Sequence, residues 1–345
     1  MDPNSGKKNM FNKLSKKQCL EALRKEDFNR TTISFYKYVL IDSLPSLRDQ
    51  LYSEWLDLQI LGRIYIAQEG INAQLSIPDF NLEKFRQRIN SYSFLKDVPF
   101  KIAVDNNYLS FFKLTIKIKE KIVEDGLSIR DYDFSKVGDH LNAKQWNEAI
   151  DRGAILVDMR NHYESEIGKF VGAICPQTET FKEELPIVKD ILHGKESKEI
   201  LLYCTGGIRC EKASAYLNHH GFKNVNQLHG GIIDYVNQLK KDDSLENKFI
   251  GKNFVFDERR SERVSEDVIS KCHQCGSECD QHVNCENVNC NLLFIQCDNC
   301  RKSHQNCCSI ECMTINNLPE SEKKKLRKGK QNQKRYYRHK KIRLR

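Results

Sequence analysis

The chain contains 345 residues, of which 56 are Lys or Arg and 47 are Asp or Glu, so its formal net charge is +9. This length predicts two or three domains, each large enough to bury a hydrophobic core. No segment approaches the roughly 18 consecutive apolar residues of a membrane-spanning helix. The first 30 residues contain no apolar run, and we therefore expect no signal peptide.

The first third of the chain predicts a flexible segment followed by a small α+β domain. Residues 1–29 are polar and basic, which is typical of a flexible N-terminal segment. Residues 30–125 predict elements in the order β-α-β-β-α-β, which is the order of the ferredoxin-like split βαβ fold. The expected strands span 33–40, 62–67, 71–77, a segment through Ile102 and 111–118, and the expected helices span 44–58 and 81–89.

The central region, residues 135–245, alternates strands and helices and predicts an α/β domain with a parallel sheet. Its most informative segment is an apolar strand, 199–203, that leads into Cys204, two glycines and Arg209. The glycines allow the backbone N–H groups to turn toward the Cys204 side chain, and the following helix start adds a partial positive charge. With Arg209 as a permanent cation, this loop predicts a lowered pKa for Cys204 and a nucleophilic thiolate. The alternative is a buried cysteine that ends a core strand.

A second cysteine, Cys210, lies six residues after Cys204. Two thiols across a tight loop can form a disulfide, or one can resolve a persulfide formed on the other. The alternative is that Cys210 is a small residue that packs inward at a helix start, and the sequence does not choose between these interpretations.

The flanking sequence of this loop resembles the rhodanese family over about residues 137–239. In that family the first cysteine of the loop carries a persulfide, and that position is Cys204 here. The resemblance also gives Glu164 a structural role, so we interpret His162 and Glu164 as structural residues and not as iron ligands. The matching residues are Val157, Asp158, Arg160, Glu164, Gly168, Gly172, Ala173, the loop from Cys204, Gly221, Phe222, Gly230 and Gly231.

Ten of the 14 cysteines lie between Cys272 and Cys312, within a region, residues 246–315, that has few aliphatic residues. Such clustering is typical of metal binding in a cytoplasmic protein and not of a secreted disulfide scaffold. The spacing predicts a cross-braced module with two structural zinc ions, each held by four thiolates. The expected ligands are Cys272, Cys275, Cys297 and Cys300 for one ion, and Cys285, Cys290, Cys308 and Cys312 for the other.

Other ligand sets for this module stay open. The second set has competitors in Cys279, Cys307, His273, His282 and His304. An iron–sulfur cluster is also compatible with four cysteines, because the sequence alone does not separate it from zinc.

The positive charge is concentrated in the last part of the chain, residues 316–345. Residues 323–345 hold thirteen Lys or Arg and no acidic residue, whereas the rest of the chain has 43 basic and 47 acidic residues. Tyrosines interleave the cations, which favours a disordered tail that binds RNA. The alternative is a solvated tail that aids solubility. We expect the substrate to be contacted by Arg209, Lys212, Lys334, Arg335 and Arg338.

The order of these parts resembles the oxygen-dependent tRNA uridine(34) hydroxylases. The resemblance rests on six features: the segments 30–38 and 67–74, the loop 203–212, the segment 250–259, the cysteine cluster and the basic tail. It implies hydroxylation of the wobble uridine at C5 in the anticodon loop of tRNA, with molecular oxygen as co-substrate. From the chemistry of the loop we expect Cys204, Arg209 and Cys210 to be the catalytic residues. No flavin, nicotinamide or haem motif is visible in the sequence, and the sequence gives no indication of an oligomeric state.

Two other functions remain open at this stage. One is a sulfurtransferase that passes persulfide sulfur to an acceptor, and the other is an RNA-binding or redox-sensing protein without catalysis. For the hydroxylase, we hypothesise that Cys204 adds to C6 of the uracil and makes C5 electron-rich, or that Cys204 carries activated oxygen as a sulfenic-type species.

Overall fold

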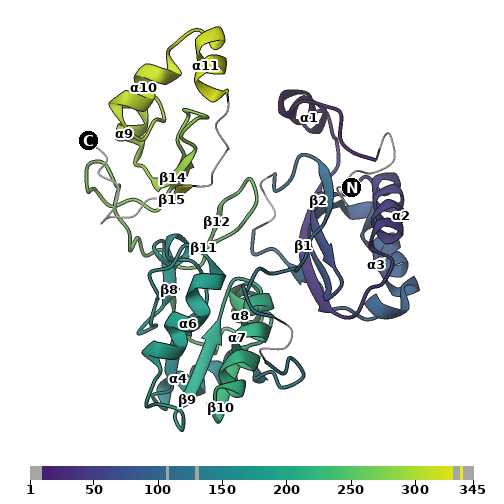
Figure 1. Ribbon diagram of the computed structural model, residues 1–345, viewed down its shortest axis with the longest axis vertical. Coiled ribbons are helices and arrows are strands. Elements are labelled where there is room, and N and C mark those ends of the chain that lie inside the picture. The colour runs from purple at the N-terminus through teal and green to yellow at the C-terminus, as the bar shows by residue number, and fades with distance from the viewer. Residues whose placement is uncertain (1–9, 106–108, 129–131, 329–334, 337–345) are drawn as a thin grey trace.

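The computed structural model describes residues 10–105, 109–128 and 132–328, together with the backbone of Arg335–Tyr336. The chain forms an N-terminal α+β domain, a central α/β domain and a C-terminal cysteine-rich module, as Figure 1 shows. The predicted fold class is therefore confirmed. No helix in the described ranges has the length and apolar character needed to cross a membrane.

The N-terminal domain has a five-stranded sheet in the order β4-β1-β3-β2-β5. Neighbouring strands among β4, β1, β3 and β2 pair antiparallel, as the ferredoxin-like fold requires, and β5 pairs with β2 in parallel. The strands are β1 (Arg30–Tyr38), β2 (Leu61–Ala67), β3 (Gly70–Pro78), β4 (Lys101–Ile102) and β5 (Leu114–Ile118), and the two main helices are α2 (Leu44–Asp57) and α3 (Leu82–Ser91). The predicted order of elements is therefore confirmed.

The two faces of this sheet have different partners, because successive side chains of a strand point to opposite faces. Ile33 and Phe35 are buried in the core that includes residues of α2 and α3. The alternate residues Tyr36 and Tyr38 reach the central domain, where their hydroxyls donate to the Glu211 carboxylate at 2.9 Å and to the Ile208 carbonyl at 3.1 Å. The second face of the sheet is thus docked on the helix that follows the Cys204 loop.

A short helix, α1 (Lys16–Leu23), precedes this domain. Its N-cap is Ser15, whose side chain accepts from the Gln18 backbone while the Gln18 side chain accepts from the Ser15 backbone. The expectation of a flexible segment over residues 1–29 did not include this helix, although a serine followed three residues later by glutamine is a capping-box pattern.

The central domain has a parallel four-stranded sheet in the order β6-β10-β9-β7. Strand β9 is central, and its residues 200–203 are fully buried, as expected for a parallel sheet covered on both faces. The strands are β6 (Asp139–Leu141), β7 (Ile155–Asp158), β9 (Glu199–Tyr203) and β10 (Asn224–Leu228), and the helices are α4 (Ala143–Asp151), α5 (His162–Ser165), α6 (Phe181–Ile191), α7 (Ile208–His219) and α8 (Gly231–Leu239).

A three-stranded antiparallel sheet connects the central domain to the C-terminal module. It pairs β8 (Gly168–Phe170) with β11 (Phe249–Phe254), which in turn pairs with β12 (Ser261–Arg263). The turn between β11 and β12, residues 255–260, passes beside the N-terminal sheet, since the Arg63 guanidinium donates to the Phe256 carbonyl at 3.0 Å. We call residues 255–260 the strap.

The C-terminal module combines short elements with two small buried clusters rich in cysteine. Its elements are β13 (His282–Asn284), β14 (Leu292–Ile295), α9 (Asp298–Ser303), α10 (Ile310–Asn316), α11 (Glu320–Arg327) and β15 (Arg335–Tyr336). The tail was expected to be disordered from residue 316. Within this stretch the structure has α11 and pairs the backbone of β15 with β14, whereas residues 329–334 and 337–345 lie outside the described residues.

Candidate active site

Cys204 lies at the carboxyl end of β9, in the loop that leads into α7. Gly207 caps this helix with a left-handed φ of +92°, a conformation that glycine adopts without strain. Its N–H donates to the Cys204 sulfur at 3.1 Å. The thiol is only 1% exposed. The predicted cradle of backbone N–H groups and a helix start around this sulfur is present in the structure.

The surroundings of Cys204 stabilise its thiolate. Burial alone would raise its pKa, but the Cys210 thiol, the Arg209 charge and the backbone N–H groups of Arg209 and Gly206 together lower the pKa of Cys204 to about 5. Burial and the neighbouring Cys204 raise the pKa of Cys210 well above its usual value. The arrangement is therefore a thiolate, Cys204, beside a neutral thiol donor, Cys210. Both cysteines are free and buried.

Arg209 is held by a buried carboxylate. Its guanidinium donates two hydrogen bonds to Glu164, at 2.7 and 2.9 Å, and Glu164 also accepts from the Asn161 backbone at 3.0 Å. Arg209 is 8% exposed and lines the cavity beside Cys204. Glu164 has the structural role that the sequence indicated, because it fixes the cation that stabilises the thiolate.

A second buried carboxyl group lies nearby and was missed by the sequence analysis. Glu184 on α6 is fully buried, and neither of its oxygens has a hydrogen-bond partner among the described residues. Burial raises its pKa well above the usual value, although the Arg209 charge acts in the opposite direction. Burial without a hydrogen-bond partner therefore favours the neutral form of Glu184.

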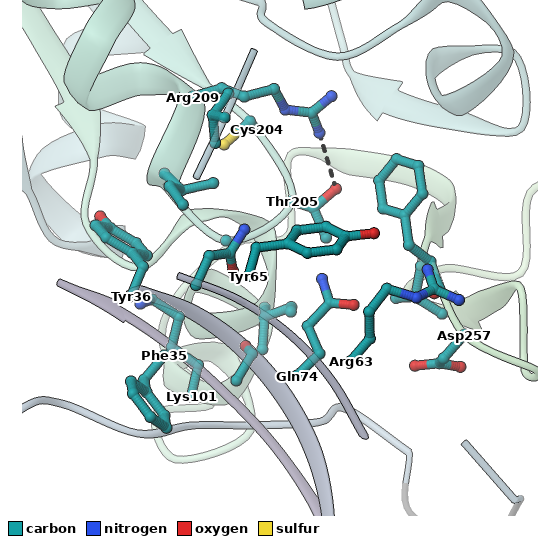
Figure 2. Close-up of a pocket in the computed structure, with 18 of the residues that line it drawn as sticks. Phe35, Tyr36, Arg63, Tyr65, Gln74, Lys101, Cys204, Thr205, Arg209 and Asp257 are labelled. Atoms are coloured by element: carbon teal, nitrogen blue, oxygen red, sulfur yellow. Dashed lines mark hydrogen bonds between the residues drawn. The ribbon is translucent and has the colours of Figure 1, made fainter. Parts of the chain in front are cut away.

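A cavity of about 500 Å³ lies over the Cys204 loop. Its walls come from the N-terminal sheet, from the central domain and from the strap. Figure 2 shows Arg63, Tyr65 and Gln74 extending from the sheet toward the wall that carries Thr205 and Asp257. Three segments that are distant in sequence therefore build one site.

The sheet wall of the cavity consists of two cross-strand rows of mostly polar residues. One row is Tyr36, Asn72 and Tyr65, and the other is Ser34, Gln74 and Arg63. Neither the Gln74 amide nor the Tyr65 hydroxyl makes a side-chain hydrogen bond to any described residue, so both can bind a ligand in the cavity. The sequence contained a signal for this wall, because polar residues alternate with buried ones along β2 and β3.

Lys101 is a further cavity residue that no motif indicated. It comes from β4, and its ammonium lies 4.3 Å from the centre of the Tyr36 ring. Burial lowers the pKa of Lys101 to about 8, although the Cys204 charge acts in the opposite direction. A lysine with such a pKa can exchange a proton near neutral pH.

Lys212, expected to contact the substrate, lies instead between the domains. It is 1% exposed, and its ammonium donates to the Glu69 carboxylate at 2.8 and 3.0 Å and to the Val123 carbonyl at 3.2 Å. It also pairs with Asp125 at 2.8 Å. Lys212 is absent from the cavity wall, and its visible role is to join the two domains.

The tail residues expected to contact the substrate are described only in part. Lys334 and Arg338 lie outside the described residues, and Arg335 is described only by its backbone in β15.

The eight cysteines predicted as metal ligands form two separate groups of four. Within each group the sulfurs lie within 4.8 Å of one another, and each group can hold a metal ion. Sulfur–sulfur distances are 3.6 Å for Cys275 and Cys297 and 3.7 Å for Cys290 and Cys308. A zinc–sulfur distance of about 2.3 Å separates the corners of a tetrahedron by about 3.8 Å, so the donor sets fit zinc.

The pairing of cysteine hairpins follows the cross-braced order expected from the spacing. The first hairpin, Cys272–Cys275, meets the third, and the second, Cys285–Cys290, meets the fourth. Corresponding N–H groups support the two sites, since Cys297 donates to the Cys272 sulfur and Cys308 to the Cys285 sulfur, each at 3.4 Å. Cys279, Cys307 and the competing histidines belong to neither group among the described residues.

Three family models match the chain in the order of its structural parts. A UPF0176 acylphosphatase like domain matches residues 30–122, a rhodanese-like domain matches residues 142–238, and a rhodanase C-terminal region matches residues 250–313. The matches coincide with the N-terminal domain, the central domain and the region that contains the strap and the cysteine groups.

Relatives match nearly the whole length of the chain. The tRNA uridine(34) hydroxylase of Leptospira interrogans is 54% identical over 338 residues, which covers 98% of this chain and 92% of the relative. Proteins with the same name from Photorhabdus laumondii and Escherichia fergusonii are 46% identical over 325 residues, covering 94% of this chain and 92% and 93% of the respective relatives.

Proposed function

The chain belongs to the tRNA uridine(34) hydroxylase family, and from this premise we propose that it hydroxylates the wobble uridine of tRNA at C5 with molecular oxygen. The observation that carries the proposal is the Cys204 thiolate at the floor of a cavity large enough for a nucleoside. In this proposal the anticodon loop presents an unstacked uridine to the cavity, as single-stranded RNA loops allow.

Cys204 acts as the nucleophile. Its sulfur forms a bond to C6 of the uracil, and the electron pair of the C5–C6 double bond moves toward C5 and the C4 carbonyl. C5 becomes electron-rich and reacts with oxygen. Loss of the C5 proton then restores the double bond and expels the Cys204 thiolate, and Lys101 accepts that proton in its neutral form. The pKa of about 8 for Lys101 supports this role.

The electron balance assigns a role to Cys210. One atom of dioxygen enters the uridine, and reduction of the second atom to water requires two electrons and two protons. The Cys210 thiol takes the outer oxygen of a C5 hydroperoxide and becomes a sulfenic acid, which leaves the hydroxyl on C5. The Cys204 thiolate, once expelled from C6, attacks that sulfur, closes a disulfide and releases hydroxide, which is protonated to water. The two sulfurs give the two electrons, the Cys210 thiol gives one proton and solvent gives the other, and an external thiol reduces the disulfide for the next cycle. The closeness of the two thiols, through which Cys210 lowers the pKa of Cys204, supports this assignment.

The sheet wall recognises the base. The Gln74 amide carries a donor and an acceptor, and the uracil edge presents a carbonyl acceptor beside an N–H donor, so the two match as a pair of hydrogen bonds. Tyr65 offers an aromatic surface beside it, and aromatic stacking is a common mode of base recognition in single-stranded RNA. Arg209 stabilises negative charge near Cys204 and does not read the base.

The two cysteine groups hold structural zinc in this proposal. Four thiolates saturate a tetrahedral ion and leave no position for substrate, so the metal stabilises the module without taking part in the reaction. We propose that the protein acts in the cytoplasm, where its tRNA substrate is found.

A sulfurtransferase activity is the second candidate. The observation that favours it is the rhodanese-like loop, which stabilises an anionic sulfur on Cys204 as a persulfide carrier requires. A rhodanese activity explains the loop but not the polar sheet wall or the cysteine-rich module.

Nucleoside mass spectrometry of tRNA distinguishes the two candidates. Cells lacking this protein are complemented with the wild type, with Cys204→Ser, or with Cys175→Ser as a matched control outside the cavity. We expect C5-hydroxylated uridine at position 34 with the wild type and the control, carrying label from ¹⁸O₂, and none with Cys204→Ser. Hydroxylation that persists in Cys204→Ser, or label that comes from water, would overturn the proposal.

A further inference from the structure

A second cavity, of about 760 Å³, lies between the strap and the C-terminal module. It shares Arg259 with the cavity over Cys204, so the two cavities adjoin at the strap. Five basic side chains line it, together with three acidic ones, Asp105, Glu258 and Glu286. The basic residues are Lys252, Arg259, Arg260, Arg263 and Arg301.

Three of these five cations have carboxylate partners. Lys252 and Arg263 both pair with the Asp280 carboxylate. Arg259 pairs with Asp257 and with Glu262, each at 2.6 Å. These residues therefore have ion-pair partners within the fold.

Arg260 and Arg301 differ from the other three. Among the described residues neither forms an ion pair, and their side-chain hydrogen bonds go to neutral amide oxygens. Arg260 donates to Asn284 at 2.5 Å and Arg301 donates to Asn306 at 2.7 Å. Burial, with the Arg301 charge nearby, lowers the pKa of Arg260, although Glu258 acts in the opposite direction. Glu258 is itself paired with Lys16 at 2.8 Å.

The backbone of the strap directs Arg260 into this position. Arg260 has a left-handed φ of 63°, which is uncommon for a residue with a side chain. The turn is closed by a hydrogen bond from the Arg260 N–H to the Asp257 carbonyl at 3.1 Å, and by one from the Val255 N–H to the Arg260 carbonyl at 2.9 Å.

His282 adds an unsatisfied polar group to the same cavity. Its side chain is 6% exposed, it lines the cavity, and neither ring nitrogen has a hydrogen-bond partner in the described part of the chain. A neutral imidazole keeps one N–H donor. Two arginines without carboxylate partners and a buried donor without an acceptor together fit an anionic oxygen group.

We propose that this second cavity binds a backbone phosphate of the RNA strand whose uridine occupies the first cavity. The inference rests on the proposed function, because the first cavity supplies the base. Arg260 and Arg301 contact the phosphate oxygens as charged donors, and His282 donates to the same group. Arg259 stays paired and separates the base from its phosphate.

Binding of a fluorescent anticodon stem-loop tests this proposal without chemistry, in a Cys204→Ser background. We expect Arg260→Gln combined with Arg301→Gln to weaken binding by roughly tenfold or more, and to reduce the slope of log affinity against log salt by about 0.7 for one lost phosphate contact. A variant with Arg260→Lys in place of Arg260→Gln, still combined with Arg301→Gln, should bind more tightly than the double Gln variant. Arg152→Gln, an exposed arginine paired with Glu199, is the matched control and should bind as the parent does. Unchanged zinc content shows that the variants are folded.

Replacing one phosphate of the RNA by an uncharged analogue identifies which phosphate the second cavity contacts. A methylphosphonate on one side of the wobble uridine should weaken binding to the parent protein but cause no further loss in the double variant. Equal affinities and equal salt slopes for parent and double variant would overturn the phosphate site. So would a double variant that loses inorganic phosphate binding yet binds the stem-loop normally. If the methylphosphonate weakens binding as expected but the wild-type protein, which keeps Cys204, does not hydroxylate tRNA, only the proposed function is overturned.

Discussion

The ammonium group of Lys101 lies 4.3 Å from the centre of the Tyr36 ring, and both side chains line the cavity over Cys204. The Tyr36 hydroxyl is in turn held by Glu211 on α7 at 2.9 Å. The ring is therefore fixed to the central domain, and it holds the lysine over the cavity by a cation–π contact. The position of a proton acceptor in one domain thus depends on a helix of the other.

Replacing Lys101 should remove a proton acceptor but leave substrate binding largely intact. We expect Lys101→Gln to lower kcat by roughly 100-fold, with a small change in KM for tRNA. In the wild type the rate should rise with pH through about 8, as the neutral amine forms, and this limb should be absent in the variant. Steady-state kinetics against pH measure both effects, and a wild-type rise at that pH that survives in Lys101→Gln would exclude the role.

Alkylation by iodoacetamide should distinguish the two kinds of cysteine in the central domain. The pKa of Cys204 is lowered to about 5, so its alkylation should be constant at neutral pH and fall only below about pH 5. Burial raises the pKa of Cys175 to about 11, so its alkylation should rise throughout the neutral range. Mass spectrometry of tryptic peptides reports both rates in one sample. Parallel pH profiles for the two residues would contradict the thiolate assignment.

Substituting a cysteine of one group should remove the metal ion of that group and leave the ion of the other group bound. We expect two zinc ions per chain, and one ion for either Cys272→Ser or Cys285→Ser, because each belongs to a different group. Cys279→Ser and Cys307→Ser are the controls and should retain two. Elemental mass spectrometry gives the stoichiometry. Visible absorbance from an iron–sulfur cluster, or full zinc content in the ligand variants, would refute the assignment.

Glu184 should make stability depend on pH in a specific direction. Its pKa is raised in the folded protein, whereas in the unfolded chain it is about 4.3. Above that value the unfolded state releases a proton that the folded state keeps, so the free energy of unfolding falls as pH rises toward the folded pKa. Glu184→Gln should therefore gain stability relative to the wild type as the pH rises above about 4.3. Urea unfolding at several pH values measures the free energy of unfolding, and Glu183→Gln, at an exposed neighbouring residue, is the control. An equal pH dependence in the wild type and in Glu184→Gln would contradict the raised pKa of Glu184.

The basic tail should contribute to affinity and not to turnover. Replacing Lys334, Arg335 and Arg338 by Gln should reduce the salt slope of tRNA binding by about 2, if each contacts one phosphate, with little change in kcat at saturating tRNA. The control replaces three exposed lysines of the central domain, Lys144, Lys198 and Lys223. A tail that serves only solubility predicts equal slopes for the wild type and both variants.

The parts of the fold that follow from local patterns were predicted from the sequence. Alternating apolar residues identified the N-terminal strands, and Cys204 followed by two glycines identified the loop before α7. The two groups of four cysteines were predicted by spacing alone, because tetrahedral thiolate sites restrict the gap between paired ligands. In each of these cases the residues that decide the structure are close in sequence.

The parts that depend on domain docking were not predicted. Lys212 was expected to contact the substrate, but its partner Glu69 lies 143 residues away, and no local pattern encodes that pairing. Lys101 and Gln74 reach the Cys204 cavity only because the N-terminal sheet packs on α7. The free cations of the second cavity were also hidden, since the sequence does not show which arginines have carboxylate partners.

The three-sided cavity has a consequence for how the protein is made. Its walls come from residues on β1 to β4, from the Cys204 loop and from the strap that ends at Arg260. A ribosome releases these segments in that order, so a nascent chain exposes the reactive sulfur after the central domain folds and before the strap emerges. During that interval Cys204 is open to oxidants on the side that the strap later covers. Protection of the thiolate is therefore completed late in translation, and a chain that terminates before the strap would carry a reactive cysteine without a substrate site.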